Sequence, residues 1–416
     1  MPPVSATPPP AISPTQQRQR HAGGAAERVF LGLLDRHVED ARIRLTIRGE
    51  PVTVGRGAEG PAIHVHDDRF FGRVLSAGNL GLGESYMDGD WDVEEGDIAG
   101  FLTVLLRARL DRRIRGNAAT AARVLAIQAG NLFRRRHWKN AQVHYDIGDD
   151  LYQSFLDRDW MMYSCGYADS PGDTIEQLQA RKLDRICQKL EMRPGDHVLD
   201  IGCGFGGMLM YAAAHYGVTG VGITTSRRHC AFGNERIARA GLADRIRLEN
   251  RDHRSVEGRF DRVVSIGMME HLPRAEYGRY FQRIARVLPP HGTGLVHVIG
   301  CNAARNVHDP FTQKYIFPGS GTPKLSELAD GCERNGLAIR DVENMVRHYD
   351  YTSARWLDRF RENRHRLDQK KYDARFQRMW EYYLSCAIAG ARASDAALYQ
   401  VLFMKDYAAP MPLHRV

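Results

Sequence analysis

The sequence lacks any run of about 18 apolar residues, the length at which a segment becomes a candidate for crossing a membrane. Its N-terminus also lacks the apolar core of a secretory signal peptide. We therefore expect a soluble protein that is not exported by this route.

Cysteine is scarce, with seven in 416 residues, and the seven are scattered without the spacing typical of metal ligands. Their distribution favours free thiols in a reducing cytoplasm. We expect no metal site.

Acidic residues are outnumbered, with 50 Asp and Glu against 58 Lys and Arg, which gives a net charge of +8. Such a charge favours an anionic partner, either nucleic acid or a phospholipid surface, without choosing between them. The chain also lacks the Asn/Asp-Pro-Pro-Tyr/Phe tetrapeptide of base methyltransferases and any recognisable nucleic-acid module. We therefore expect no nucleic-acid partner.

The most informative segment is an apolar run that leads directly into glycines, Val198-Leu-Asp-Ile-Gly-Cys-Gly-Phe-Gly-Gly207. It predicts a buried parallel strand and a tight turn, followed by a helix over residues 208–214. Glycines allow backbone torsions and close approaches that side chains block. The pattern fits a nucleoside cofactor but leaves both a dinucleotide and S-adenosylmethionine open. A turn without any ligand is the structural alternative.

The next predicted strand, residues 218–225, ends in threonines and lacks the acidic residue that holds a dinucleotide ribose. This absence disfavours a dinucleotide. Asp200 lies instead at the start of the glycine turn, where its carboxylate is placed to hold an amino-acid ammonium or to order the loop.

Strand and helix patterns alternate through the middle of the chain, which predicts right-handed βαβ units and a doubly wound α/β sheet. Ligands of such sheets collect at the carboxyl ends of the strands. Strands are expected at 196–201, 218–223, 246–249, 260–266 and 294–299, and helices at 227–240 and 275–287.

A chain of this length exceeds one ordinary core, so we expect several regions. Residues 1–27 are predicted to be a disordered tail, and 28–110 a small α+β domain. Residues 111–139 form a basic helical linker, suited to anionic lipid or merely solvated. The catalytic candidate runs from Asn140 to about Ile299, and the region 301–416 is expected to hold helices and a closing apolar strand near 399–404.

Several separated motifs carry a family resemblance. They are His144–Asp149, Met162-Tyr-Ser-Cys165, 198–207, Gly222–Ser226, Phe260–His271, Lys314-Tyr-Ile-Phe-Pro318, Gly81–Gly89 and Tyr382-Tyr-Leu384. Together they resemble the cyclopropane fatty acid synthase family of S-adenosylmethionine-dependent methyltransferases. The resemblance spans nearly everything after residue 28. The N-terminal module makes the chain more similar to bacterial phospholipid-modifying enzymes than to the single-domain mycolic acid enzymes.

The resemblance implies a class I methyltransferase, Rossmann-like fold with a small N-terminal α+β domain and lipid-binding insertions at 140–416. It also implies methylene transfer from S-adenosylmethionine to the cis double bond of an unsaturated phospholipid acyl chain. The carbocation that results loses a proton to bound bicarbonate before the ring closes. We therefore expect a cytoplasmic enzyme at the inner face of the membrane, bound peripherally to its anionic surface, and a homodimer.

The family's bicarbonate site falls on Cys165, Glu270, His297, the backbone of Ile299 and Tyr349. Glu270 would orient bicarbonate or act with it as base, and His297 and Tyr349 would donate hydrogen bonds to it. Cys165 would be a weak donor. Each of the three side chains other than Glu270 also has an ordinary packing role as its alternative.

Cofactor contacts are implied in the same way. Tyr163 and Ser164 would touch the methionine end. The other expected contacts are Leu199, Asp200, Gly202, Cys203, Gly204, Phe205, Gly206, Thr224, Thr225, His229, Asp252 and His253.

Some positions depart from the family pattern. Phe205 replaces a usual Trp, His229 replaces a frequent Gln, and His253 replaces an aromatic residue. Cys386 is one position away from a cysteine of the phospholipid enzymes, which puts a catalytic role for it in doubt. Two alternatives stay open: a same-fold enzyme that adds a methyl or methylene branch to another alkene or a specialised metabolite, and a lipid-binding relative without turnover.

Overall fold

The computed structural model describes residues 23–110, 148–302, 309–394 and 396–408. The chain divides into two compact units, Met1–Asn140 and Ala141–Val416. The predicted linker at 111–139 and the start of the motif at 144–147 lie outside the described residues. So does the predicted tail up to residue 22.

The first unit contains an α+β fold, as predicted. Its four-stranded sheet has the order β2-β1-β3-β4, with β1 and β3 parallel and the other neighbours antiparallel. Aromatic rings fill its core, where Trp91 lies against Phe70, Tyr86 and Phe101. The elements are α2 Ala25–His37, β1 Ala41–Ile47, β2 Glu50–Gly55, β3 Ala58–Val65, α3 Arg69–Ala77, α4 Asn79–Met87, β4 Trp91–Glu95 and α5 Ile98–Arg107.

One boundary of this unit differs from the prediction. Helix α2 begins at Ala25, inside the segment expected to be a disordered tail. The buried Glu27 carboxylate accepts a 2.6 Å hydrogen bond from the Arg48 guanidinium, and this ion pair ties the helix to the sheet. Composition alone does not reveal such a pairing partner.

The second unit is built on a seven-stranded sheet in the order β10-β11-β9-β8-β5-β6-β7. Strands β5 to β9 are parallel, and β11 and β10 add antiparallel pairs at one edge. The doubly wound α/β prediction is therefore confirmed. The strands are β5 His197–Ile201, β6 Thr219–Thr224, β7 Ile246–Asn250, β8 Arg262–Ile266, β9 Thr293–Gly300, β10 Ala338–Asn344 and β11 Ala397–Met404.

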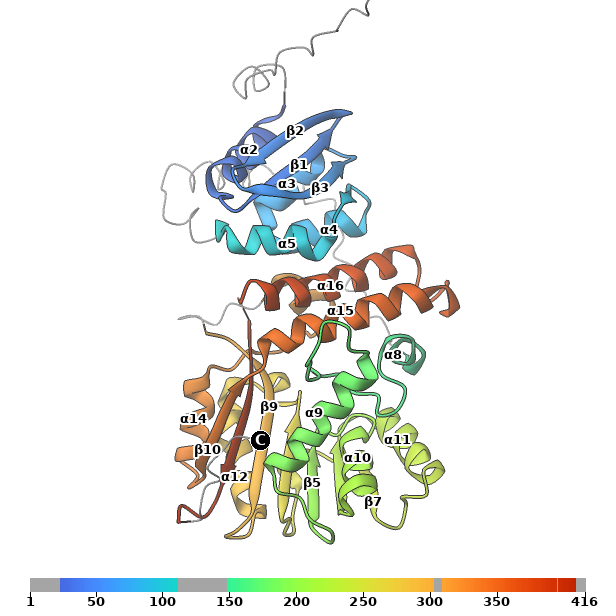
Figure 1. Cartoon of the computed structure of the whole chain (residues 1–416), viewed down its shortest axis with the longest axis vertical. Helices are drawn as coiled ribbons and strands as arrows, with labels where there is room; N and C mark the ends of the chain where they lie inside the picture. The colour runs from blue at the N-terminus through green and yellow to red at the C-terminus, as the bar shows by residue number, and fades with distance from the viewer. Residues whose placement is uncertain (1–22, 111–147, 303–308, 395, 409–416) are drawn as a thin grey trace, which may run out of the picture. The chain divides into compact units, whose positions relative to one another are not determined.

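Helices cover both faces of this sheet (Figure 1). Alternate residues of a strand point to opposite faces. Leu199 of β5 therefore packs in the cluster that contains α12 and α14, whereas Val198 packs in the cluster that contains α9 and α10. The helices are α8 Asp149–Phe155, α9 Ile175–Lys189, α10 Gly207–Tyr216, α11 Arg227–Arg239, α12 Tyr277–Val287, α13 Pro310–Tyr315, α14 Leu325–Glu333, α15 Val346–Asn363 and α16 Ala374–Arg392.

The long helices α15 and α16 pack against each other and carry an aromatic cluster. Trp356 of α15 and Trp380 of α16 both lie against Phe155, and Tyr163 contacts Trp356 with ring centroids 5.3 Å apart. These rings form an apolar wall for the segment that carries Tyr163. Within the described ranges, no helix is both long enough and apolar enough to cross a membrane.

Candidate functional site

The glycine turn after β5 has the conformation that its sequence predicts. Gly202, Gly204 and Gly206 have φ of 83°, 53° and 83°, values that side chains disfavour. A Cβ on Gly202 would lie 2.5 Å from the Met268 side chain, whereas one on Gly204 would meet nothing within 4 Å. The turn is therefore packed against Met268 at Gly202 and open at Gly204, where a ligand can approach the backbone.

Asp200 is the last residue but one of β5, two positions before Gly202. Its side chain is 2% exposed, and its Oδ1 atom has no hydrogen-bond partner in the structure. Burial raises the pKa of this carboxyl to about 7, against the opposing field of the Lys182 ammonium. A buried carboxylate with a free oxygen fits the ammonium of an amino-acid ligand.

An aromatic wall lies on the other side of the turn. The Phe205 and His229 ring centroids are 4.4 Å apart, and Tyr152 lies 5.6 Å from Phe205. Cys203 is buried beside the turn, and Leu199 is buried in β5. The structure thus brings Phe205 and His229 together, with their rings tilted by 46°, as two aromatic groups that a purine could contact.

The remaining predicted cofactor contacts follow β6 and β7. Thr224 is buried and its Oγ1 accepts a 3.2 Å hydrogen bond from the Ser226 amide, whereas Thr225 is exposed. Asp252 is engaged by Arg254 through two 2.9 Å hydrogen bonds. His253 lies edge-on to Tyr280, and its buried Nε2 atom has no partner. Of these, the His253 imidazole has the clearer unfilled capacity for a ligand.

Side chains of α9 form hydrogen bonds with the segment from Tyr163 to Cys165. Gln179 donates a 2.8 Å hydrogen bond to the Ser164 carbonyl, and the Lys182 ammonium donates a 2.9 Å bond to Ser164 Oγ. The Tyr163 hydroxyl lies 2.8 Å from that of Tyr383. Both tyrosine hydroxyls and Ser164 are thereby fixed in place.

Glu270 and His297 both lie near the carboxyl end of β8: Glu270 follows the strand, and His297 of β9 is paired with its last residue, Ile266. Glu270 Oε1 accepts a 3.1 Å hydrogen bond from the Ile299 amide, and its Oε2 is buried without a partner. His297 Nδ1 lies 3.2 Å from Gln400 Nε2, while His297 Nε2 is buried without a partner. Burial raises the pKa of Glu270 to about 7. Burial, with Lys182 and Lys189 nearby, holds the pKa of His297 well below its usual range.

Cys165 and Tyr349 approach the same place from other elements. Cys165 is buried, and Thr352 of α15 donates to its sulfur over 3.9 Å. Burial raises the pKa of its thiol to about 12, so the sulfur stays protonated. Burial raises the pKa of the Tyr349 phenol well above its usual range, and the neighbouring Tyr383, Cys165 and Glu270 add to the shift. Both groups therefore remain neutral, and the Cys165 thiol already donates to the Gly166 carbonyl at 3.1 Å.

The free polar atoms of the site fit the two groups that the resemblance implies. A buried polar atom without a partner costs free energy, about 1 to 3 kcal/mol, and a ligand that pairs with the atom would offset that cost. Asp200 Oδ1 fits a cationic amino group, and His297 Nε2 fits an oxyanion. Among the described residues, no group of three or more His, Cys, Asp or Glu side chains could hold a metal ion.

Sequence reasoning missed the residues behind this site. Gln179, Lys182 and Lys189 all lie on α9 and are buried, as is Gln400 on β11. The α9 residues are three and seven apart, a helical spacing that places them on one face with Ile186. The sequence offered one signal for them: Lys182 and Lys189 fall on the apolar stripe of the helix, where lysine is unusual. The polar residues facing α9 come from strands distant in sequence and gave no such signal.

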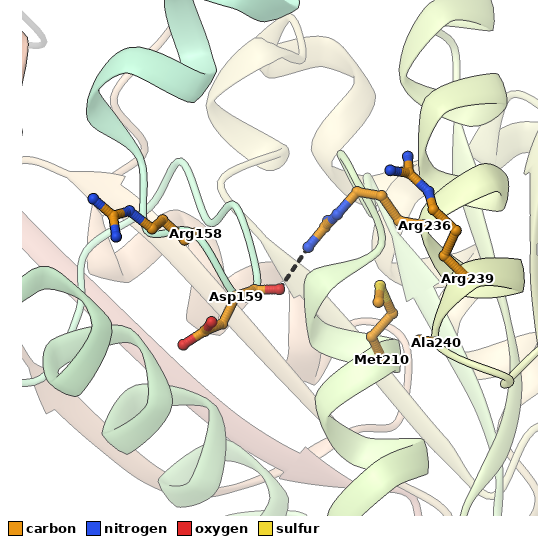
Figure 2. A pocket seen from close by; sticks show the side chains of 6 residues that line it. All are labelled: Arg158, Asp159, Met210, Arg236, Arg239 and Ala240. Atoms are coloured by element: carbon orange, nitrogen blue, oxygen red, sulfur yellow. Dashed lines mark hydrogen bonds between the residues drawn. The ribbon is translucent and has the colours of Figure 1, made fainter. Parts of the chain in front are cut away.

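Arg236 of α11 was also missed, and Figure 2 shows its surroundings. It lines a surface hollow of about 370 Å³ that contains none of the predicted site residues. Its guanidinium donates to the carbonyls of Asp159 at 2.6 Å, Phe205 at 3.1 Å and Trp160 at 3.4 Å. Arg236 therefore ties the segment before Tyr163 to the glycine turn.

Comparison with known proteins adds independent information. Residues 133–401 match the family model described as mycolic acid cyclopropane synthetase. Over 350 residues the chain is 38% identical to the cyclopropane-fatty-acyl-phospholipid synthase of Escherichia coli strain K12, covering 84% of this chain and 89% of the relative. It is 31% identical to the tuberculostearic acid methyltransferase UfaA1 of Mycobacterium tuberculosis, covering 95% of each.

The fold has a solved counterpart. The crystal structure of mycolic acid cyclopropane synthase CmaA1 complexed with SAH and CTAB superposes with a TM-score of 0.56 and 27% identity. The match covers 65% of this chain and 98% of that one. The two chains therefore share the core that surrounds the glycine turn.

Replacing Arg236 by methionine should weaken binding of S-adenosylhomocysteine about tenfold. The three carbonyls lose their donor, and the segment before Tyr163 is then no longer tied to the glycine turn. The matched control is Arg239→Met on the same helix and hollow, where Arg239 pairs with exposed Glu235. Isothermal titration calorimetry measures both affinities. Equal affinities for the two variants would contradict this account of Arg236.

The affinity for S-adenosylhomocysteine should fall as the pH drops below about 7, by up to tenfold per pH unit, and level off above it. Protonation neutralises the Asp200 carboxylate, which then no longer attracts the ligand's ammonium. Calorimetry across this range should show the trend in the wild type and in Glu270→Gln. Asp200→Asn should bind more weakly and without this slope; an unchanged slope in that variant would refute the assignment.

Proposed function

Because the chain belongs to the cyclopropane fatty acid synthase family of S-adenosylmethionine-dependent methyltransferases, we propose that it acts on phospholipids. It transfers a methylene group to the cis double bond of an unsaturated acyl chain and forms a cyclopropane ring. The observation that carries this proposal is a pair of buried unpartnered atoms near the carboxyl end of β8: Glu270 Oε2, whose carboxylate accepts from the Ile299 amide, and Nε2 of His297, which pairs with the last residue of β8.

An alkene is a weak nucleophile, so the reaction depends on orientation and on the exclusion of water. When bound, S-adenosylmethionine supplies the methyl group, and bicarbonate accepts the proton that leaves the acyl-chain carbocation. Asp200, Ser164 and the open glycine at Gly204 are the groups suited to hold the methyl donor. Phe205 and His229 provide a wall for its base.

The anion pocket is supported by groups with complementary chemistry. His297 Nε2 and the Tyr349 hydroxyl are donors suited to a small oxyanion, whereas the neutral Cys165 thiol, expected as a weak third donor, already donates to the Gly166 carbonyl. The Ile299 amide already donates to Glu270, so we assign Ile299 to orienting that carboxylate. The raised pKa of Glu270, about 7, lets it share a proton with a bound anion near neutral pH.

Aromatic rings cluster beside Tyr349, whose ring contacts that of Trp356. Tyr163 lies between Trp356 and Phe317, with centroid distances of 5.3 and 6.3 Å, and Tyr383 lies 6.0 Å from Phe317. Ring faces stabilise a cation in a dry pocket. Their buried hydroxyls have raised pKa values, chiefly through burial, so the tyrosines add no negative charge that would trap the cation.

The partner and location follow from the substrate. We propose a peripheral association with the anionic inner face of the cytoplasmic membrane, supported by the net charge of +8 and by the phospholipid named for the Escherichia coli relative. A homodimer remains our expectation from the family resemblance.

A branch-forming reaction is the second candidate function. The relative that matches over 95% of both chains is named as a tuberculostearic acid methyltransferase, and other relatives are named as sphingolipid C9-methyltransferases. The same carbocation yields a branch when the proton is lost elsewhere. Gas chromatography with mass spectrometry of the product acyl chains separates a ring from a branch.

The direct test is incubation of the purified protein with S-adenosylmethionine and liposomes of a cis-unsaturated phospholipid. We expect each modified double bond to gain the mass of one CH2 group. Liposomes with saturated chains are the control. No mass gain with any cis-unsaturated lipid would refute the proposal.

Glu270→Gln should bind S-adenosylhomocysteine as the wild type does but lose at least a hundredfold in turnover, because proton removal needs the carboxylate. Calorimetry and the liposome assay measure the two quantities. The matched control is Glu276→Gln, which replaces a carboxylate in the following short helix, Arg274–Glu276. Turnover near the wild-type level in Glu270→Gln would exclude Glu270 from the reaction.

A further inference from the structure

Helix α9 places a polar stripe, Gln179, Lys182 and Lys189, against the sheet, and Lys189 is the last residue of the helix. The Lys189 side chain is 3% exposed, and its ammonium donates to Glu343 at 2.5 Å and to Gln400 Oε1 at 2.7 Å. Asp341 lies 3.9 Å from the same ammonium. The carboxylates of β10 therefore neutralise the charge of Lys189, which also donates one hydrogen bond to the neutral Gln400 amide of β11.

That bond decides which way the Gln400 amide faces. A lysine ammonium has only donors, so the Gln400 atom beside it must be the carbonyl oxygen. The amide nitrogen then points the other way, where it lies 3.2 Å from His297 Nδ1. Gln400 is 2% exposed, so water has little room to satisfy the amide in the reverse orientation.

The amide orientation in turn decides where His297 carries its proton. Gln400 Nε2 is a donor, so His297 Nδ1 must be the acceptor and carries no hydrogen. The single proton of the neutral imidazole then sits on Nε2, the buried atom without a partner. An imidazolium would place an N–H against the N–H of Gln400, which opposes protonation of the ring.

Register supports this chain of contacts. His297 and Gln400 are directly paired residues of the antiparallel strands β9 and β11. Paired residues point to the same face, and this face is the one covered by α9, where Leu295 and Leu402 also pack. Lys189, Gln400 and His297 therefore form a line of hydrogen bonds that leads from Glu343 of β10 to the imidazole of His297.

We infer that Lys189 and Gln400 are positioning residues that hold His297 as its neutral Nε2–H tautomer, so that a hydrogen-bond donor faces the oxyanion of the reaction. The role of the oxyanion rests on the proposed function, whereas the tautomer is a property of the protein alone. Other charged groups near the line are Arg185, 4.0 Å from Glu343, and Lys182, whose ammonium acts on His297 through space. Neither offers His297 an acceptor for an Nδ1–H.

The test reads the tautomer directly in the ligand-free protein. Protein labelled with 15N-histidine is studied by long-range 1H–15N correlation, and the His297→Asn spectrum identifies the His297 signals. At pH 7 we expect a protonated Nε2 and an unprotonated Nδ1. A protonated Nδ1 in the wild type, as the other tautomer or as imidazolium, would overturn the inference.

Gln400→Glu reverses the relevant contact while keeping the shape of the side chain, because a carboxylate oxygen accepts from Nδ1–H. The His297 Nδ1 atom should become protonated. Lys189→Met should release the amide and give mixed Nδ1 and Nε2 protonation, whereas Lys189→Arg keeps the donors and should retain the wild-type spectrum. A wild-type spectrum in Lys189→Met would remove Lys189 from the line, even if Gln400→Glu failed to fold.

Turnover separates this inference from the proposed function. With the tautomer switched, turnover in the liposome assay should fall about a hundredfold in Gln400→Glu, the loss typical of removing one oxyanion donor. Turnover that is lost in Lys189→Met should recover in Lys189→Arg to within threefold of the wild type. S-Adenosylhomocysteine affinity should stay unchanged. A switched tautomer with unchanged turnover would uphold the positioning by Lys189 and Gln400 and refute the role of His297 in the proposed reaction.

Discussion

Buried charge between α9 and the sheet is the constraint on which the rest of the site depends. The Lys182 ammonium is fully buried, and burial lowers its pKa to about 8 against the fields of Asp157, Cys165 and Asp200. Its bond to Ser164 fixes the segment before Cys165, and its charge acts on both Asp200 and His297. One ammonium thus links the two halves of the site, the half that holds the methyl donor and the half that handles the proton.

The cost of this arrangement explains its location. Burying polar groups without partners is unfavourable, and a parallel sheet with helices on both faces concentrates such groups where its strands end. Asp200 lies in β5 and His297 in β9, and Glu270 follows β8, which lies between those two strands. The antiparallel β11 completes the set by presenting Gln400 opposite His297. A ligand that forms hydrogen bonds with these unpartnered atoms would offset the free energy that their burial costs during folding.

Much of this could be predicted from the sequence, because local patterns carry it. The glycine turn and the strands at β5 to β9 follow from apolar runs and glycines, and the predicted bounds agree with the structure within a few residues. Strand β10 was missed because its charged residues hide the alternation of an edge strand. The buried lysines of α9 and the amide of Gln400 were missed because their roles come from partners on other elements, which no local pattern specifies.

The central claim is that the free buried atoms of Glu270 and His297 serve an anion that takes part in the chemistry. Turnover of unsaturated phospholipid should therefore be measured in buffer stripped of carbon dioxide, as a function of added bicarbonate at constant pH and ionic strength. The account predicts low activity without bicarbonate and a saturable rise as it is added. Activity that is independent of bicarbonate, with added chloride giving the same rate, would contradict it.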